Sequence, residues 1–176
     1  MNTTTDTRTV AVDAIQTARQ RTIRNGLFAV LVGLVGGFGL VFSMLGGISL
    51  SPLPVFFQLD FPGTPAGWKA VHLGMLMNGL MAIIIGLAMR RFALTPRKAA
   101  CVSWGTIIAV WGNFAFYFFG LFAHNHGLTL GGNRTGPGNF AGALAFAPAL
   151  LGAVTLFIAI FILAFSPFRS SSTQGD

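Results

Sequence analysis

The sequence is organised around an apolar stretch that carries two polar side chains, VHLGMLMNGLM at residues 71–81. His72 and Asn78 stand six residues apart in this stretch, within a long apolar run that predicts a membrane-spanning helix. An unpaired polar side chain in hydrocarbon is costly, so such residues are usually paired or functional. The imidazole of His72 is also a common metal ligand. The stretch therefore predicts a site on a buried helix.

The composition is that of an integral membrane protein. The chain has 176 residues, of which 53% are hydrophobic and only 9% are charged. A soluble domain has roughly 25% charged residues, and so few charges cannot cover a surface that faces water. The single cysteine, Cys101, excludes an internal disulfide and a cysteine-rich metal site.

The apolar runs predict an all-α bundle of four membrane-spanning helices. Residues 25–168 form the transmembrane domain, and each expected span is long enough to cross a hydrocarbon core of ~30 Å. The N-terminal segment 1–24 precedes it, and within it residues 9–24 form either a short amphipathic helix on the bilayer or a basic flank of the first span. Residues 169–176 form a polar tail. The expected spans are about 26–50, 68–93, 99–122 and 140–165.

Glycines and prolines add local expectations. Small residues four apart in the first span, Gly33 with Gly37 and Gly39 with Ser43 and Gly47, predict a close helix–helix contact within or between subunits. The segment 51–68 holds four prolines and is expected to be a loop, with its aromatic side chains at the membrane interface. Pro148 is expected to kink the fourth span.

The net charge of +7 is explained by the flanks of the spans. The basic residues border apolar runs and do not form a patch interleaved with aromatic side chains, so nucleic-acid binding is not expected. An even number of spans places both termini on one side, which then has nine basic residues against two, Lys69 and Arg134. The positive-inside rule predicts that this side is the cytoplasm. The nine residues are Arg8, Arg19, Arg21, Arg24, Arg90, Arg91, Arg97, Lys98 and Arg169.

Four polar side chains are expected at matched depths of the second and third spans. His72 and Tyr117 form a layer near the outer ends of their spans, and Asn78 and Asn113 form a deeper layer. Asn113 and Tyr117 are four residues apart and so share a helix face. Six residues correspond to ~600° of helical rotation, which places Asn78 ~120° around the helix from His72.

The residues alone leave several roles open. His72 could be a hydrogen-bonded structural residue, a ligand of haem or another metal, or a proton carrier. Tyr117 could be an interfacial anchor or a catalytic residue. His124 and His126 lack a third ligand and are weak candidates for a metal site. The remaining candidates are more often used for packing or for hydrogen bonds between helices: Asn78, Asn113, Met75, Met77 and Met81.

Taken together, these residues resemble the styrene oxide isomerases, small bacterial inner-membrane enzymes of styrene degradation. The resemblance covers residues 25–168 and rests on the four spans, on Gly67-Trp68 followed by HLGMLMNGLM, and on Asn113 and Tyr117 late in the third span. It implies a homotrimer with haem b between protomers, in which His72 ligates the ferric iron. It also implies that Asn78 and Tyr117 hold a small aryl epoxide.

The implied reaction is a Meinwald rearrangement, in which styrene oxide becomes phenylacetaldehyde without net redox change. A ferric haem with one protein ligand has an open position, so the iron can act as a Lewis acid on the epoxide oxygen. A 1,2-hydride shift then gives the aldehyde, while Tyr117 and Asn78 stabilise the developing negative charge. Further candidates for haem contacts are Lys69, Trp68 and Asn113.

Three other functions remain open at the level of sequence. A hydroxylaminobenzene mutase is a similarly small membrane isomerase. A haem-binding electron-transfer subunit usually needs two axial ligands, and this chain has one intramembrane histidine, with Met75 or Met81 as a possible second ligand. A structural four-span subunit needs no cofactor.

Because His72 and Asn78 lie on different sides of one helix, we expect the site at a boundary between protomers.

Overall fold

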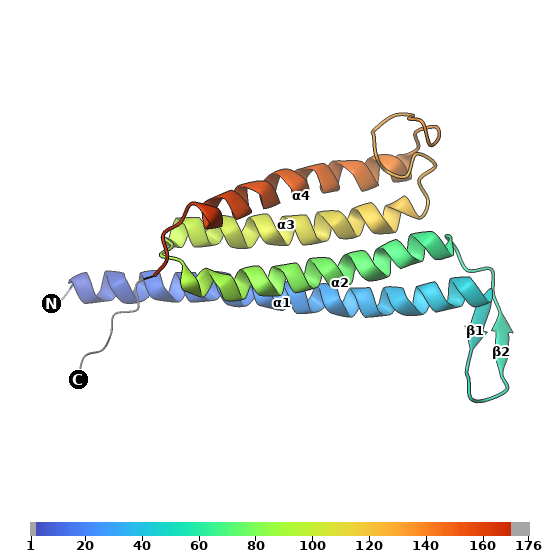
Figure 1. Ribbon diagram of the computed structural model, residues 1–176, viewed down its shortest axis with the longest axis horizontal. Helices are drawn as coiled ribbons and strands as arrows, with labels where there is room; N and C mark the ends of the chain where they lie inside the picture. Colours follow the sequence, from blue (N-terminus) through green and yellow to red (C-terminus); the bar gives the residue numbers. More distant parts are fainter. Residues whose placement is uncertain (1–2, 170–176) are drawn as a thin grey trace.

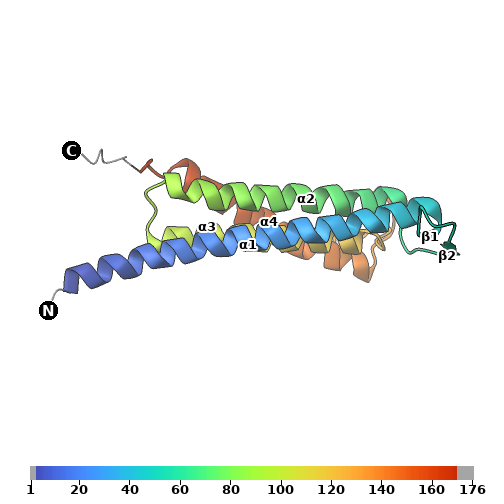
Figure 2. The ribbon, with the colours of Figure 1, turned by 90° about the horizontal axis from the view of Figure 1, so that it is seen from below.

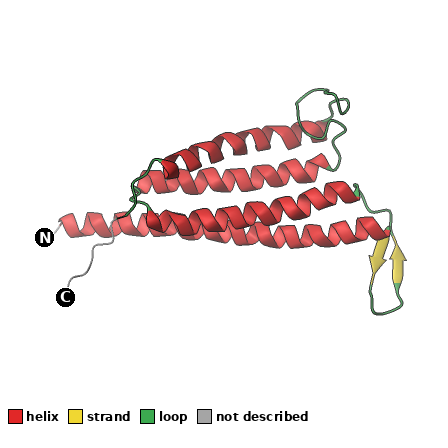
Figure 3. Ribbon diagram, in the orientation of Figure 1, coloured by secondary structure: helices red, strands yellow, loops and turns green. Residues whose placement is uncertain are grey.

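The computed structural model describes residues 3–169 and consists of four long helices with one short β-hairpin (Figures 1 and 3). A single 3-10 turn, η1, directly follows the second helix. The elements in chain order are α1 (Thr3–Leu45), β1 (Gly47–Ser49), β2 (Phe56–Gln58), α2 (Pro65–Ala88), η1 (Met89–Arg91), α3 (Pro96–Gly120) and α4 (Phe140–Ala164).

The helices pack as two pairs. α1 lies along α2 and α4 lies along α3, while α3 contacts both α1 and α2 and so joins the pairs (Figures 1 and 2). Thr3 and Arg169, the first and last described residues, lie at the same end of the bundle, which we call the termini end. The opposite end carries β1 and β2 and is called the hairpin end.

All four helices are long and apolar enough to cross a membrane. Large apolar side chains point outward along them, for example Val35, which is 67% exposed, and Phe157, which is 73% exposed. In water such a surface would be unfavourable, whereas lipid tails solvate it. The prediction of four helices able to span a membrane is therefore confirmed, and the side that faces the cytoplasm stays a prediction.

The first helix differs from the expected span 26–50. α1 is continuous from Thr3 to Leu45, so residues 9–24 form no separate surface helix. Its 43 residues make it ~65 Å long, more than twice the hydrocarbon core. It ends five residues earlier than expected because Gly46 adopts a left-handed conformation with φ of 65°, which terminates helices.

The segment 51–68, expected to be a loop, contains β2 and the first turn of α2, while β1 lies just before it. β1 pairs with β2 in antiparallel register, Gly47 opposite Gln58. The other helices begin close to the expected positions. α2 begins at Pro65 and α3 at Pro96, each three residues before the expected start. Thr64 and Thr95 precede these prolines, and their hydroxyl groups accept hydrogen bonds from the first turn. Proline suits the first helical position because its missing N–H has no partner there.

Glycines let α1 and α2 approach closely. A side chain at Gly26 would lie 2.7 Å from the backbone oxygen of Gly79, and a side chain at Gly79 would lie 2.7 Å from the oxygen of Gly26. A side chain at Gly33 would lie 2.9 Å from the backbone nitrogen of Leu76. The close contact predicted from the first span is thus found within the chain, against α2.

Two further expectations concern Pro148 and the polar tail. Pro148 was expected to kink the fourth span, and it lies inside α4, which continues as one helix on both sides of it. The polar tail is described only at Arg169, and residues 170–176 lie outside the described part of the chain.

Candidate active site

Three of the predicted polar residues meet between α2 and α3. The amide nitrogen Nδ2 of Asn113 donates to Oδ1 of Asn78 at 2.7 Å. Nδ2 of Asn78 in turn donates to the backbone oxygen of Gly74 at 2.7 Å and to the hydroxyl oxygen of Tyr117 at 3.3 Å. Of the four polar residues expected at matched depths, Asn78, Asn113 and Tyr117 lie together, whereas His72 bonds to a backbone oxygen of α1 instead. We call Asn78, Asn113 and Tyr117 the amide–tyrosine network.

Gly74 makes the place for the Tyr117 ring. A side chain at Gly74 would collide with the ring carbons of Tyr117, so only glycine admits the aromatic ring against this turn of α2. The same turn supplies the carbonyl group that holds Asn78. Sequence reasoning noted the polar residues but missed Gly74, although its place four residues before Asn78 is a signal for a close contact.

The hydrogen bonds of the network fix which groups donate and which accept. Both hydrogens of the Asn78 amide are engaged, one with Gly74 and one with Tyr117. The Tyr117 oxygen accepts the second of these, so its own O–H remains to donate to another oxygen. Asn78 is 7% exposed, and in such a poorly solvated place a hydrogen bond is stronger than in water. The network therefore presents one oriented proton donor.

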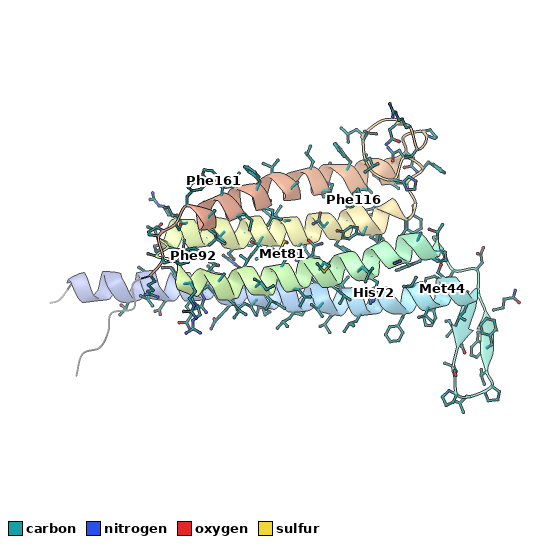
Figure 4. All side chains as sticks on the ribbon, viewed as in Figure 1. Met44, His72, Met81, Phe92, Phe116 and Phe161 are labelled. Carbon is teal, nitrogen blue, oxygen red and sulfur yellow. The ribbon has the colours of Figure 1, made fainter. Side chains whose placement is uncertain are left out.

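His72 lies on a different side of α2, against α1. Its Nδ1 is 2.7 Å from the backbone oxygen of Gly33. Because a carbonyl oxygen only accepts, Nδ1 carries the proton and Nε2 is left with a free lone pair. Figure 4 shows His72 where α2 meets α1, in the half of the bundle nearer the hairpin end.

The ring of His72 is also held sterically. A side chain at Gly37 would lie 3.0 Å from Nδ1, so the ring occupies the space that glycine leaves free on α1. A histidine fixed through Nδ1 by a backbone carbonyl group is the usual arrangement of an axial or metal ligand. The residues around His72 thus fit a group that is bound through Nε2.

The three further candidates for haem contacts, Trp68, Lys69 and Asn113, have different surroundings. Nε1 of Trp68 donates to the backbone oxygen of Pro62 at 2.8 Å, and the indole ring packs on Gly39, so Trp68 joins the start of α2 to α1. Lys69 is exposed, one turn before His72. Asn113 belongs to the amide–tyrosine network and contacts Asn78 on the α3 side, away from the α1 side on which His72 packs.

A cavity of about 490 Å³ adjoins the network at the hairpin end. Tyr117 lines it together with apolar and small residues from α2, α3 and the following loop, among them Ala70, Phe116 and Leu121. His124 and His126 also line it, but residues 3–169 contain no group of three or more histidine, cysteine or acidic side chains that could hold a metal ion. The cavity was not predicted, although small residues at Ala66, Gly67 and Ala70 could have signalled it.

Comparison with known proteins identifies the family of the chain. The model of the styrene oxide isomerase family matches residues 18–168. The chain belongs to the styrene oxide isomerase family. The styrene-oxide isomerase of Pseudomonas fluorescens is 32% identical over 150 residues, which cover 85% of this chain and 88% of that relative.

The resemblance predicted from the residues is thereby confirmed, and the chain is an isomerase. The matched region contains all four helices' apolar stretches and every residue of the amide–tyrosine network. It begins at residue 18 and so leaves out the first turns of α1, the part that extends beyond the other helices at the termini end (Figure 2).

Proposed function

We propose that this protein converts aryl epoxides, such as styrene oxide, into the corresponding aldehydes, phenylacetaldehyde in that case. The observation that carries the proposal is the orientation of the Tyr117 hydroxyl group. Asn78 holds its oxygen from one side, which leaves its proton for a substrate oxygen beside an apolar cavity. A hydrogen-bond donor fixed before the reaction stabilises negative charge that develops on that oxygen.

We further propose ferric haem b as the cofactor, with His72 as the residue that would ligate its iron. His72 fits this role because Gly33 fixes its Nδ1 proton and leaves Nε2 as the ligating atom. When bound, the ferric haem supplies a Lewis acid for the epoxide oxygen and requires no net redox change. Lys69 and Trp68 are the proposed neighbours of the propionate groups; the exposed ammonium group of Lys69 suits an anion better than the indole, which is already bonded to Pro62.

The side chains of the network then act on the substrate. Tyr117 donates its hydrogen bond as the benzylic C–O bond breaks and the oxygen gains negative charge. Hydride then moves with its electron pair from the oxygen-bearing carbon to the benzylic carbon, and the C=O bond forms. All atoms of the product come from the substrate, so no carboxylate base is needed. Asn113 acts through Asn78, whose amide it orients.

The cavity beside Tyr117 provides the surroundings for the aryl group. Ala70, Phe116 and Leu121 offer apolar walls, and 490 Å³ is the size of a small-molecule pocket. Exclusion of water protects the carbocation that forms at the benzylic carbon, which water would otherwise capture as a diol. The apolar lining therefore favours rearrangement over hydrolysis.

The positions of His72 and Tyr117 support a site between protomers. His72 packs towards α1, whereas Tyr117 packs towards α2 from α3, so the two face different sides of α2. In a homotrimer, the α1 side of one protomer can meet the α3 side of the next, which brings a ligand and a donor to one haem. We place this trimer in the bacterial inner membrane, with both termini in the cytoplasm.

The electron-transfer alternative needs Met75 or Met81 as a second ligand, and the positions of these side chains do not favour it. Met75 is completely buried in a core cluster with Ala29, Ala82 and Val110, and Met81 packs against the same cluster. Their sulfur atoms thus contribute to helix packing, as expected for methionine in a core.

The test is an optical spectrum of the detergent-purified protein, followed by product analysis with styrene oxide. We expect a ferric Soret band and phenylacetaldehyde, and we expect the variant His72→Ala to lose both. Leu73→Ala, a change at an exposed position on the same helix, is the matched control and should keep both. A protein without Soret absorption refutes the haem assignment, and conversion of phenylhydroxylamine in place of styrene oxide indicates the mutase reaction.

A further inference from the structure

A second cavity lies at the termini end of the bundle, remote from the amide–tyrosine network. Its volume is about 930 Å³, and it is open to the surface between α1, the end of α2 with η1, and the C-terminal segment. Four arginines line it: Arg19, Arg90, Arg91 and Arg169. The rest of its lining is largely apolar and includes Val12, Ile15, Leu87 and Phe92.

The C-terminal segment is fixed where it completes this cavity. Phe168 forms a β-bridge with Phe92, and their rings stack with centroids 5.0 Å apart. The backbone nitrogen of Ala93 donates to the oxygen of Pro167 at 2.9 Å, and that of Arg169 donates to the oxygen of Arg91 at 2.8 Å. Arg169 is therefore held beside Arg91, although 78 positions separate them in the sequence.

Arg19 of the cavity differs from its neighbour Arg21 in the partners of its guanidinium group. The Nε of Arg21 donates to the hydroxyl group of Ser103 at 3.3 Å, and its guanidinium lies 4.3 Å above the ring of Trp104. The Nε of Arg19 makes only a long hydrogen bond of 3.4 Å, to the backbone oxygen of Gly86. Arg21 is thus engaged by partners inside the bundle, whereas Arg19 faces the cavity.

The positive charge of the cavity has no acidic counterpart in its lining. Only two acidic side chains fall within the part of the chain whose side chains the structure describes, Asp13 and Asp60. Asp60 follows β2 at the hairpin end, and Asp13 is exposed and not part of the lining. Four like charges around one hollow repel one another, and a bound anion relieves this repulsion.

We propose that this cavity binds the phosphate group of an anionic phospholipid. Guanidinium groups match the oxygen atoms of a phosphate with paired hydrogen bonds, which favours phosphate over a simple halide. The apolar half of the lining suits the glycerol and upper acyl chain, and the cavity lies at the ends of membrane-spanning helices, where headgroups are found. The site does not depend on the isomerase reaction.

The test compares two pairs of substitutions that remove the same charge from the same end. Arg90→Gln with Arg169→Gln changes the cavity, and Arg97→Gln with Lys98→Gln changes exposed residues at the start of α3 outside it. Native mass spectrometry of the full-length protein in detergent would measure binding of phosphatidylglycerol against phosphatidylcholine. We expect the cavity pair to bind phosphatidylglycerol about tenfold more weakly and the control pair to stay within about twofold of the native protein.

Each outcome decides the proposal. Equal weakening in both pairs means diffuse attraction by basic flanks and overturns the site. Binding of inorganic phosphate that phosphatidylglycerol does not displace keeps an anion site but overturns its assignment to a lipid. Circular dichroism checks that the variants are folded. If the cavity pair does not fold, the single variant Arg91→Gln replaces it, because the backbone oxygen that holds Arg169 remains in place.

Discussion

The hydrogen bonds of His72 and Tyr117 determine which donor or acceptor atoms of each side chain remain free. The backbone oxygen of Gly33 accepts a hydrogen bond from Nδ1–H of His72, which leaves a lone pair on Nε2. Nδ2 of Asn78 donates to the Tyr117 oxygen, which leaves the hydroxyl proton free to donate. A nitrogen with a free lone pair and an oriented proton donor are the two parts that the proposed Lewis-acid site needs. The partner of His72 is not obvious from the type of residue, because Gly33 acts through its backbone.

Removing the hydroxyl group tests the donor. The variant Tyr117→Phe keeps the ring that packs on Gly74 and loses only the hydrogen bond. We expect kcat for styrene oxide to fall about 100-fold, as for the loss of one donor that stabilises an oxyanion, with little change in KM. Steady-state kinetics measures this, and an unchanged Soret band serves as the control for folding. An unchanged kcat would mean that Tyr117 is only an anchor.

Adding a methyl group beside His72 tests the ligand. In Gly37→Ala the new carbon would lie 3.0 Å from Nδ1 and 3.1 Å from Cε1, so the ring must move away from Gly33. Disturbing the group that orients a ligand costs about tenfold in affinity for the bound group, so we expect the haem content of the purified protein to fall. Gly131→Ala has open space around it and should keep full content. Equal content in both variants would contradict the proposed ligand.

At the scale of elements, α2 packs against α1 on one side and against α3 on another. Its glycines accept α1 on one side, and Gly74 accepts Tyr117 of α3 on another. Such small residues replace the hydrophobic drive that membranes do not provide between helices, because they permit close packing of the backbones. The same helix can therefore present His72 to α1 and Asn78 to α3 without a gap in the bundle.

This packing predicts a difference between two glycine substitutions. A methyl group in Gly79→Ala would lie 2.7 Å from the backbone oxygen of Gly26, and backbone atoms cannot rotate aside. We expect a loss of about 1–3 kcal/mol in the free energy of unfolding, seen as a lower midpoint of thermal unfolding in detergent. Gly120→Ala, also helical but in open space, is the control and should leave the midpoint unchanged. Equal midpoints would show that α1 and α2 separate easily.

At the scale of the whole molecule, the question is which protomers share a site. In one chain, His72 and the amide–tyrosine network occupy different sides of α2. A second copy is the natural source of the missing half, because symmetric oligomers place different faces of one chain in contact. The geometry of α2 thus supports a site shared between protomers, and the number of protomers stays a proposal.

Mixed oligomers test this arrangement. Cells that produce His72→Ala and Tyr117→Phe chains together should regain activity, since a boundary with His72 from one chain and Tyr117 from the other is intact. Random mixing would restore about a quarter of the sites. Each variant alone should be nearly inactive, and so should a mixture made after separate purification in which the oligomers do not exchange. If co-production restores no activity, each site lies within one protomer.

Part of this protein was determined by the sequence alone. Length of the apolar runs, scarcity of charge and placement of the basic residues predicted four membrane-spanning helices, because the bilayer fixes how long an apolar helix must be. Periodicity placed Asn113 and Tyr117 on one face, and topology matched Asn113 in depth with Asn78, to which the structure joins it. Tyr117 was matched with His72, but the structure bonds it to Asn78 instead. Local signals also anticipated the close contact of the first span.

Other features were decided only by the tertiary structure. The carbonyl group of Gly33 engages Nδ1 of His72 and leaves Nε2 free, and the docking of Phe168 on Phe92 brings Arg169 beside Arg91. These contacts join segments that are 39 or more positions apart, through backbone atoms that every residue possesses. No pattern of residue types encodes them. The sequence thus specified which side chains lie in the membrane, and the packing of the helices decided which atoms of those side chains remain free to react.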